Sequence, residues 1–289
     1  MCNGALSFAL KTWQSRMLNS ALEYWQDWGF SSKPVLLKTF KQGQNHCTGL
    51  IEVADKRFVL KVFQHSYKRT INAERWANTL DLSPEIVYAA NNIQILDYID
   101  DQGFSENKLS VLADAIQSMH SARYSPTTEF DLLGFAHEYL QTADASTLAW
   151  HQQLLPILNE FLADPTLWAF CHNDLVVENC LFSPQGNAVI IDWEFAQPNN
   201  PWFDLAAVIL YFKLNKTQAK DFLDNYQTGW SNKIGERIFI SSQIAVLWLD
   251  LLWNLKRHGV SYRAKNQSRF LELMALAEQR DILLIPNPK

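Results

Sequence analysis

The chain lacks the features that mark several common classes of protein. It has four cysteines in 289 residues, with no CxxC spacing and no His/Cys cluster. We therefore expect neither a zinc site nor a disulfide framework. The absence of a disulfide framework also predicts a reducing compartment. The formal net charge is only −5 and no basic stripe is present. This balance argues against a nucleic acid as the main partner.

Signals for export or membrane insertion are also missing. The N-terminus has no basic segment leading into an uninterrupted apolar run, so no signal peptide is predicted. The longest apolar runs, Trp202–Phe212 and Ile244–Leu255, each contain an aspartate and are short for a bilayer. We expect a soluble, cytoplasmic protein with no membrane partner, either a monomer or a homodimer.

The chain does have the composition of a well-packed protein. Hydrophobic residues make up 48% and aromatic residues 13% of it, which predicts a full core. Its length suits two domains of ordinary size, and internal repeats and low-complexity tracts are absent.

The first third has mostly β character. Helical spacing over 5–28, ended by Gly29, is followed by runs that alternate; Phe58 and Leu60 share one face, and Val59 and Lys61 the other. We predict a five-stranded antiparallel sheet with one inserted helix, from strands Val35–Phe40, Leu50–Val53, Arg57–Phe63, Ile86–Ala89 and Ile93–Ile99 and helix Arg69–Leu80.

The remainder is predicted to be mainly α-helical, which makes the fold class α+β with two lobes. Two short strands, Cys180–Phe182 and Ala188–Ile191, interrupt the helices. The boundary between the lobes is placed at residues 99 and 100. The predicted helices are Lys108–Ala122, Leu148–Leu162, 202–213, 217–229, 234–258 and 267–280.

One stretch carries the chemistry. In His172-Asn173-Asp174-Leu175-Val176-Val177-Glu178-Asn179, Asp174 and Asn179 are five residues apart, and Asp192 lies eighteen beyond Asp174. Phosphoryl transfer needs a carboxylate that orients a hydroxyl, and an amide and a second carboxylate that hold Mg²⁺. We assign Asp174 to the first role and Asn179 and Asp192 to the second.

Two residues near this stretch are predicted to support it. His172 is expected to brace the loop through hydrogen bonds rather than to transfer a proton. For Asp204, a helix N-terminal cap and a brace for the loop are both open, and each is preferred to a chemical role.

Lys61 and Glu74 are predicted to serve the nucleotide. Lys61 lies inside a strand, where a phosphate would satisfy its charge, and Glu74 on the following helix would fix its ammonium. Taken alone, a lysine in a strand more often lies on an edge strand, or buries its aliphatic stem while its ammonium reaches water. The segment Gly43–Gly49 is placed to cover phosphates, with Gly43 and Asn45 as contacts, although a plain β-turn explains it about as well.

A late helix offers a candidate substrate site. Asp250, Trp253, Asn254 and Arg257 share one face, and an indole beside a carboxylate is a suitable receptor for an organic cation. The polar face of an amphipathic helix is an equally good explanation. Tyr211 is a further aromatic candidate that is also compatible with the core.

The chain resembles the aminoglycoside phosphotransferase and choline kinase superfamily at these residues. The resemblance runs from about Lys38 to Phe270 and is clearest in His172-Asn173-Asp174-Leu175, Ile191-Asp192-Trp193-Glu194 and Phe203-Asp204-Leu205-Ala206, which look like bacterial choline kinases. It implies a protein-kinase-like fold, with a nucleotide-binding lobe over 1–99 and a catalytic and substrate-binding lobe over 100–289. It implies adenine contacts at Asp97, Tyr98 and Ile99, and places Glu194 with the substrate residues.

The resemblance leaves the acceptor open. Choline pockets of this kind tend to use two aromatic residues one helical turn apart, whereas Asp250 stands one turn before Trp253 here. Thiamine kinases share the Asp-Trp-Glu segment, and aminoglycoside-type acceptors stay possible.

We therefore predict an ATP- and Mg²⁺-dependent kinase for a small, cationic alcohol. One rival is a catalytically silent nucleotide- or metabolite-binding protein, although every polar group expected for catalysis is present. A protein kinase is disfavoured, because no arginine precedes Asp174 as in an HRD motif and no Ala-Pro-Glu segment follows.

Overall fold

The structure is a computed structural model that describes residues 13–40, 46–64, 67–124, 128–163, 168–227, 236–259 and 261–284. These residues form two compact units. Unit 1 holds the described residues up to Phe104 together with Cys180–Glu194, and unit 2 holds Ser105–Asn179 and the described residues from Phe195 onward.

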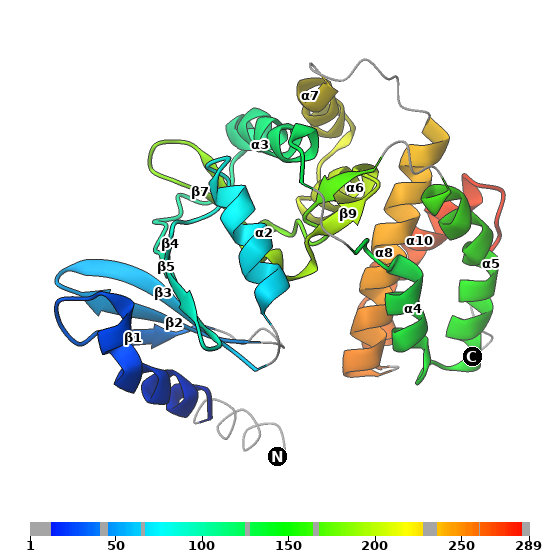
Figure 1. Cartoon of the computed structure of the whole chain (residues 1–289). Coiled ribbons are helices and arrows are strands. Elements are labelled where there is room, and N and C mark those ends of the chain that lie inside the picture. The colour runs from blue at the N-terminus through cyan, green and yellow to red at the C-terminus, as the bar shows by residue number, and fades with distance from the viewer. Residues whose placement is uncertain are drawn as a thin grey trace. The chain divides into compact units, whose positions relative to one another are not determined.

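Unit 1 is built on a five-stranded antiparallel sheet with the order β1-β2-β3-β5-β4 (Figure 1). Two-residue turns with positive φ at both positions join β2 to β3 and β4 to β5, the geometry that matches the twist of paired strands. The predicted sheet is confirmed, although β2 begins earlier than expected. The strands are β1 (Val35–Thr39), β2 (His46–Val53), β3 (Lys56–Phe63), β4 (Ile86–Ala90) and β5 (Ile93–Asp97).

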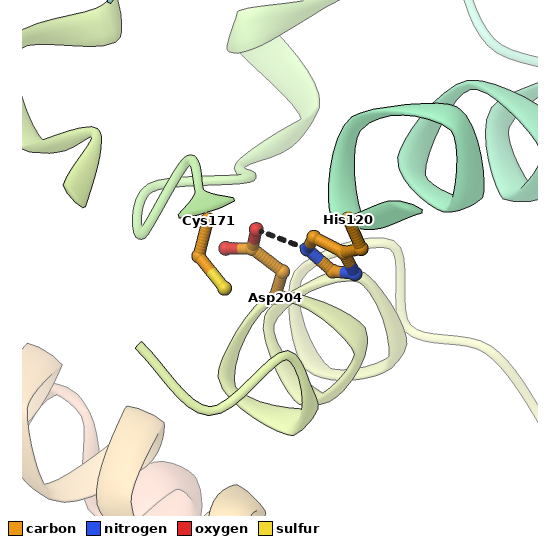
Figure 2. Close-up of side chains that lie close together, drawn as sticks. All are labelled: His120, Cys171 and Asp204. Carbon is orange, nitrogen blue, oxygen red and sulfur yellow. Dashed lines mark hydrogen bonds and ion pairs between the residues drawn. The ribbon is translucent and has the colours of Figure 1, made fainter. Parts of the chain in front are cut away.

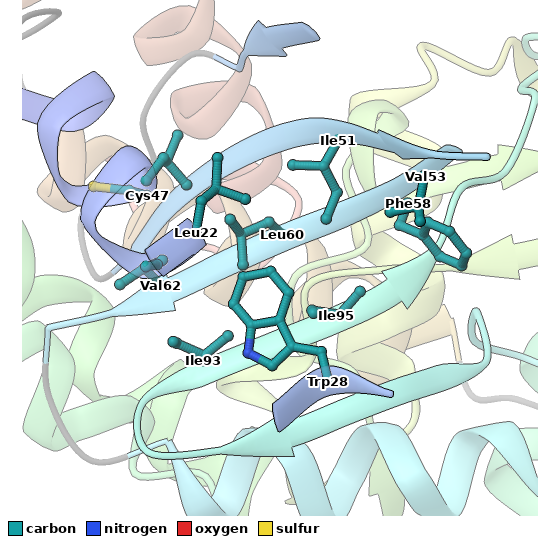
Figure 3. Packing of buried hydrophobic residues seen from close by; sticks show 12 residues of the cluster. Leu22, Trp28, Cys47, Ile51, Val53, Phe58, Leu60, Val62, Ile93 and Ile95 are labelled. Carbon is teal, nitrogen blue, oxygen red and sulfur yellow. The ribbon is translucent and has the colours of Figure 1, made fainter. Parts of the chain in front are cut away.

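One face of this sheet packs against the N-terminal helical segment. Residues 13–21 are helical and continue as the 3-10 helix η1 (Leu22–Trp28), which Gly29 ends with a φ of 78°. Figure 3 shows Trp28 lying over the sheet, where Leu60 and Ile95 are completely buried. The part of the predicted helix over residues 5–12 lies outside the described residues.

The opposite face of the sheet carries polar residues. Because side chains alternate along a strand, Lys61 and Gln94 point away from the side that Leu60 and Ile95 occupy. Both approach Glu74 of the inserted helix α2 (Lys68–Asn78). The hairpin of β7 (Cys180–Phe182) and β8 (Ala188–Ile190) belongs to the same unit, and Ile190 N donates to Leu82 O over 2.7 Å.

Unit 2 is mainly helical, as predicted. The long helix α8 contacts α4, α5, α6 and α10 and forms the centre of the unit. The sequence did not predict α4, α9 or the short β6–β9 pair. The helices are η2 (Glu106–Lys108), α3 (Leu109–Ser121), α4 (Leu132–Leu140), α5 (Ala145–Leu162), η4 (Val177–Asn179), α6 (Trp202–Tyr211), α7 (Lys216–Gln227), α8 (Glu236–His258), α9 (Ser261–Lys265) and α10 (Gln267–Glu278); the strands are β6 (Ala169–Cys171) and β9 (Gln197–Asn199), and η5 (Trp193–Phe195) lies where the units divide.

The helix α8 corrects one expectation. Among the described residues, one helix, Arg237–His258, is long and apolar enough by composition to cross a membrane. The apolar run is longer than predicted because residues before Ile244 extend the helix. More than half of it is buried inside the structure, and α8 contacts neighbouring α-helices of the unit's core.

Candidate active site

In unit 1 the structure brings Lys61 and Glu74 together. The Nζ atom of Lys61 lies 4.0 Å from Oε1 of Glu74, and both side chains are almost wholly buried. Nε2 of Gln94 donates to the other carboxylate oxygen of Glu74 over 2.5 Å. The glutamate is therefore held from two sides, and Lys61 is held near it.

Asp192 joins the same group. Its Oδ1 lies 3.6 Å from Nζ of Lys61. Burial opposes the charge of Lys61, but the carboxylates of Glu74, Asp192 and Glu194 together raise the pKa of Lys61. The lysine is thus a buried cation at neutral pH. Asp192 follows β8 with a φ of 67°, a left-handed conformation that costs on the order of 1 kcal/mol and is found often at functional sites.

His46 is a further member of this group to which the sequence gave no firm role. Its Nε2 lies 3.8 Å from Oδ1 of Asp192. Burial and the nearby Lys61 lower the pKa of His46 to about 4, against a smaller opposing effect of Asp192. One donor atom each from His46, Asp192 and Glu194 lies within 4.8 Å of the others. The signal that could have found His46 is its register in the hairpin, where it pairs with Phe63, two residues after Lys61 on the neighbouring strand.

In unit 2 the structure brings Asp174 and Asn179 together. Nδ2 of Asn179 donates to Oδ2 and to the backbone oxygen of Asp174, each over 2.9 Å. This arrangement leaves the amide oxygen of Asn179 as a hard ligand atom beside a carboxylate that keeps partial exposure. The 3-10 turn η4 supplies the five-residue spacing that makes this contact possible.

The loop that carries Asp174 is fixed by Asp204. The backbone N–H groups of His172 and Asn173 each donate to an oxygen of Asp204 over 2.8 Å. Asp204 is the third residue of α6, whose N-cap is Pro201. Asp204 therefore lies inside the helix rather than at its N-cap, and its carboxylate binds the loop. His172 also contributes, since Asp174 N lies 3.3 Å from its Nδ1.

Two further polar side chains, His120 and Tyr226, hold Asp204 in place. Nε2 of His120, in α3, lies 3.0 Å from Asp204 Oδ2, and Nδ1 of His120 lies 2.9 Å from the hydroxyl of Tyr226. Figure 2 shows His120, Asp204 and Cys171 gathered around one point. A histidine, cysteine and aspartate so close together could hold a metal. The Asp204 oxygens, however, already accept three hydrogen bonds, so the group is a structural support.

The predicted substrate residues are placed in two groups. Asp250 accepts hydrogen bonds from Arg269 over 3.1 Å and from Asn254 over 3.0 Å. Burial raises the pKa of Tyr211 well above its usual value, and Asp250 and Asp174 add to the rise. Tyr211 thus lies within electrostatic range of both carboxylates.

Trp253 has a partner of its own. The guanidinium of Arg257 lies 5.1 Å from the centre of the Trp253 ring. Each half of the predicted cation receptor, the carboxylate of Asp250 and the indole of Trp253, is therefore already engaged by an arginine of the chain.

The predicted adenine contacts lie at the end of β5. The backbone N–H groups of Asp97 and Tyr98 donate to Glu85 O and Arg57 O, so an adenine would have to use other backbone groups there. Gly43 and Asn45 lie outside the described residues.

The fold and these two groups of residues define a kinase-like phosphotransferase. Residues 37–235 match the phosphotransferase enzyme family, and the chain belongs to this family. The family predicted from the motifs is confirmed.

One sequence relative and two solved structures illustrate the likeness. Protein LicA of Haemophilus influenzae is 23% identical over 206 residues, which cover 61% of this chain and 74% of LicA. Choline kinase LicA from Streptococcus pneumoniae has a similar structure, with a TM-score of 0.74 and 20% identity over 91% of this chain and 99% of that one. A LicA crystal structure in complex with AMP gives a TM-score of 0.68 and 22% identity over 89% and 98%. The predicted α+β, kinase-like fold is confirmed.

Proposed function

We propose that the chain is a kinase that uses ATP and Mg²⁺ to phosphorylate the hydroxyl of a small, cationic alcohol. The observation that carries the proposal is the buried cluster of Lys61 with Glu74 and Asp192. Burying a lysine ammonium among carboxylates is costly, and its 3.6 Å and 4.0 Å distances are too long for hydrogen bonds. A nucleotide phosphate would supply short ones.

Each residue has a role in this reaction. Lys61, held by Glu74, would bind phosphate oxygens, and Asn179 and Asp192 would hold Mg²⁺ through hard oxygen ligands. The donor set fits the ion because both residues offer oxygen atoms. Bound Mg²⁺ would neutralise negative charge on the phosphates of the nucleotide. Asp174 would accept the hydroxyl proton and orient the acceptor oxygen, while Asp204 keeps the loop in place.

The identity of the nucleotide rests on one likeness. A structure with the same fold is a LicA complex with AMP, which supports an adenine nucleotide. We place the adenine near Asp97, Tyr98 and Ile99 and its phosphates near Gly43 and Asn45.

The acceptor is the finer part of the proposal. Relatives named as choline kinases share the fold, and Asp174 and Asp250, which both act on Tyr211 within unit 2, would give the acceptor region an acidic character. Thiamine and aminoglycosides are the alternatives with a hydroxyl and a positive charge. We propose a cytoplasmic enzyme that acts as a monomer or a homodimer.

The test is a coupled assay of ADP release against choline, ethanolamine, thiamine and aminoglycosides. We expect acceptor-dependent ADP release from the native protein and a loss of at least about 10³-fold in Asp174→Asn. ATP binding should persist in that variant. Asp221→Asn, at an exposed position of α7, serves as the control.

Two outcomes would count against the proposal. Unchanged turnover in Asp174→Asn would remove this residue from the reaction. ATP binding without acceptor-dependent turnover on any compound would favour the silent binding protein.

A further inference from the structure

Arg269 of α10 has the surroundings that a bound organic cation would have. Its Nη2 atom lies 3.1 Å from Oδ2 of Asp250 and donates a charged hydrogen bond to it. Its guanidinium lies 5.4 Å from the centre of the Tyr211 ring, within the range of a cation–π contact. A carboxylate and an aromatic ring around one positive charge form a receptor for an organic cation, and here the chain itself supplies the charge.

The receptor does not depend on this arginine for its shape. Nδ2 of Asn254, one turn further along α8, donates to Oδ1 of Asp250 over 3.0 Å, so the carboxylate stays oriented if the arginine leaves. The side chains of Arg269 and Asp250 are 24% and 18% exposed, so a small solute can reach both. Burial raises the pKa of Tyr211, and Asp250 and Asp174 add to the rise. The receptor therefore lies within electrostatic range of the candidate base.

A second carboxylate is placed to receive the guanidinium. Glu272 follows Arg269 by three residues in α10, a spacing at which helical side chains are neighbours. Its Oε2 lies 3.7 Å from Nη1 of Arg269, which is too long for a hydrogen bond and short enough for a change of side-chain rotamer to close. The arginine thus has two alternative partners, Asp250 in the acceptor region and the exposed Glu272.

We propose that Arg269 is a tethered occupant of a cation site formed by Asp250 and Tyr211, and that a small organic cation replaces it while the guanidinium turns to Glu272. The inference rests on the proposed function for the role of that cation, the acceptor, and deepens it by naming the residue that controls entry to the site. Because one cation replaces another, neither carboxylate is left unpaired. The apparent dissociation constant of the acceptor is its intrinsic value divided by the fraction of molecules in which Arg269 has left Asp250.

The test measures binding without turnover. Methylguanidinium, which has the head group of arginine and no hydroxyl, is titrated into the full chain and followed by isothermal titration calorimetry. Arg269→Gln should bind it about tenfold more tightly than the native chain does, or more, because the variant leaves the site without its tethered cation. Choline should compete with methylguanidinium for the same site in this variant. Circular dichroism checks that the variant is folded.

Glu272→Gln tests the second partner at an exposed position, where the substitution leaves the fold intact. Without the receiving carboxylate, Arg269 remains on Asp250 in more of the molecules, so choline should bind about three- to tenfold more weakly than to the native chain. In the double variant Arg269→Gln/Glu272→Gln, choline should bind as it does to Arg269→Gln alone, because no arginine needs a second partner. This comparison also removes any direct attraction between Glu272 and choline. Glu278→Gln, at another exposed position of α10, is the matched control and should bind choline as the native chain does.

The outcomes separate this inference from the proposed kinase. Methylguanidinium that binds the native chain and Arg269→Gln equally, or binds neither, would overturn the tethered cation. An effect of Glu272→Gln on choline binding that persists in the double variant would also overturn it. In both cases acceptor-dependent ADP release would leave the kinase intact. Methylguanidinium binding gained in Arg269→Gln, in a chain that phosphorylates no alcohol, would support the cation site and count against the kinase.

Discussion

The carboxylate of Asp204 lies 3.0 Å from Nε2 of His120, and neither side chain has any exposed surface. This contact joins α6 to α3 across 84 residues of sequence. The same carboxylate accepts the backbone N–H groups of His172 and Asn173. The two helices therefore fix the loop of the candidate catalytic aspartate through one buried side chain.

We predict that Asp204→Asn costs about 3 kcal/mol in the free energy of unfolding, because an amide N–H₂ would face N–H donors in a buried site. Urea unfolding followed by circular dichroism measures the change. Tyr226→Phe, which removes only the hydroxyl near Nδ1 of His120, should cost about 1 kcal/mol. Equal stabilities of the native chain and Asp204→Asn would show that the brace is unimportant.

Lys61→Met tests the nucleotide half of the site. The substitution removes the cation that is held by Glu74, so we expect kcat/KM for ATP to fall on the order of 10²-fold or more. Lys38→Met, at an exposed position of β1, should leave it unchanged. Nucleotide kinetics at saturating acceptor provide the measurement. If Lys61→Met keeps native kcat/KM, then Lys61 does not bind phosphate.

The parts of the fold that the sequence revealed are those with a regular period. Alternation around Phe58 and Lys61 assigned both faces of β3 correctly, because one face packs in a core and the other meets Glu74. The spacing of Asp174 and Asn179 likewise has a local structural cause, a turn of 3-10 helix.

The parts that were missed depend on contacts distant in sequence. The strands β6 and β9 have three residues each and are stabilised by their pairing, so neither has a pattern of its own. His120 lies on an amphipathic helix, and only the fold brings it to Asp204. The sequence left the carboxylate of Asp250 available for a substrate cation. Its actual partner, Arg269, lies 19 residues further along the chain, beyond the reach of an argument from spacing within one helix.

Glu160 of α5 provides a prediction of pH dependence. Hydrogen bonds from Arg237, and then from Arg280, outweigh burial and lower the pKa of Glu160 from 4.5 to about 2. Because the pKa is lowered on folding, its stabilisation is present above pH 4.5 and is lost as the pH falls toward 2. The side chain is 44% exposed, so screening limits the effect to about 1 kcal/mol.

We therefore expect Glu160→Gln to lower stability at pH 7 and the difference from the native chain to shrink between pH 5 and pH 3. Thermal unfolding at several pH values measures this. The exposed Glu278 of α10 gives the control Glu278→Gln, for which the difference should stay small throughout. A difference that grows on acidification would contradict the assignment.

Arg269 and Arg257 allow the two halves of the candidate cation receptor to be tested separately. Arg269 pairs with Asp250, and Arg257 lies over Trp253. If the acceptor contacts Asp250, Arg269→Gln leaves that carboxylate without its cation, and KM for a cationic acceptor should fall roughly tenfold while KM for ATP is unchanged. If it contacts the indole instead, Arg257→Gln should produce the decrease, because the face of the ring becomes available to an organic cation. Steady-state kinetics with choline or thiamine distinguish the two, and a KM unaltered in both variants would place the acceptor away from α8.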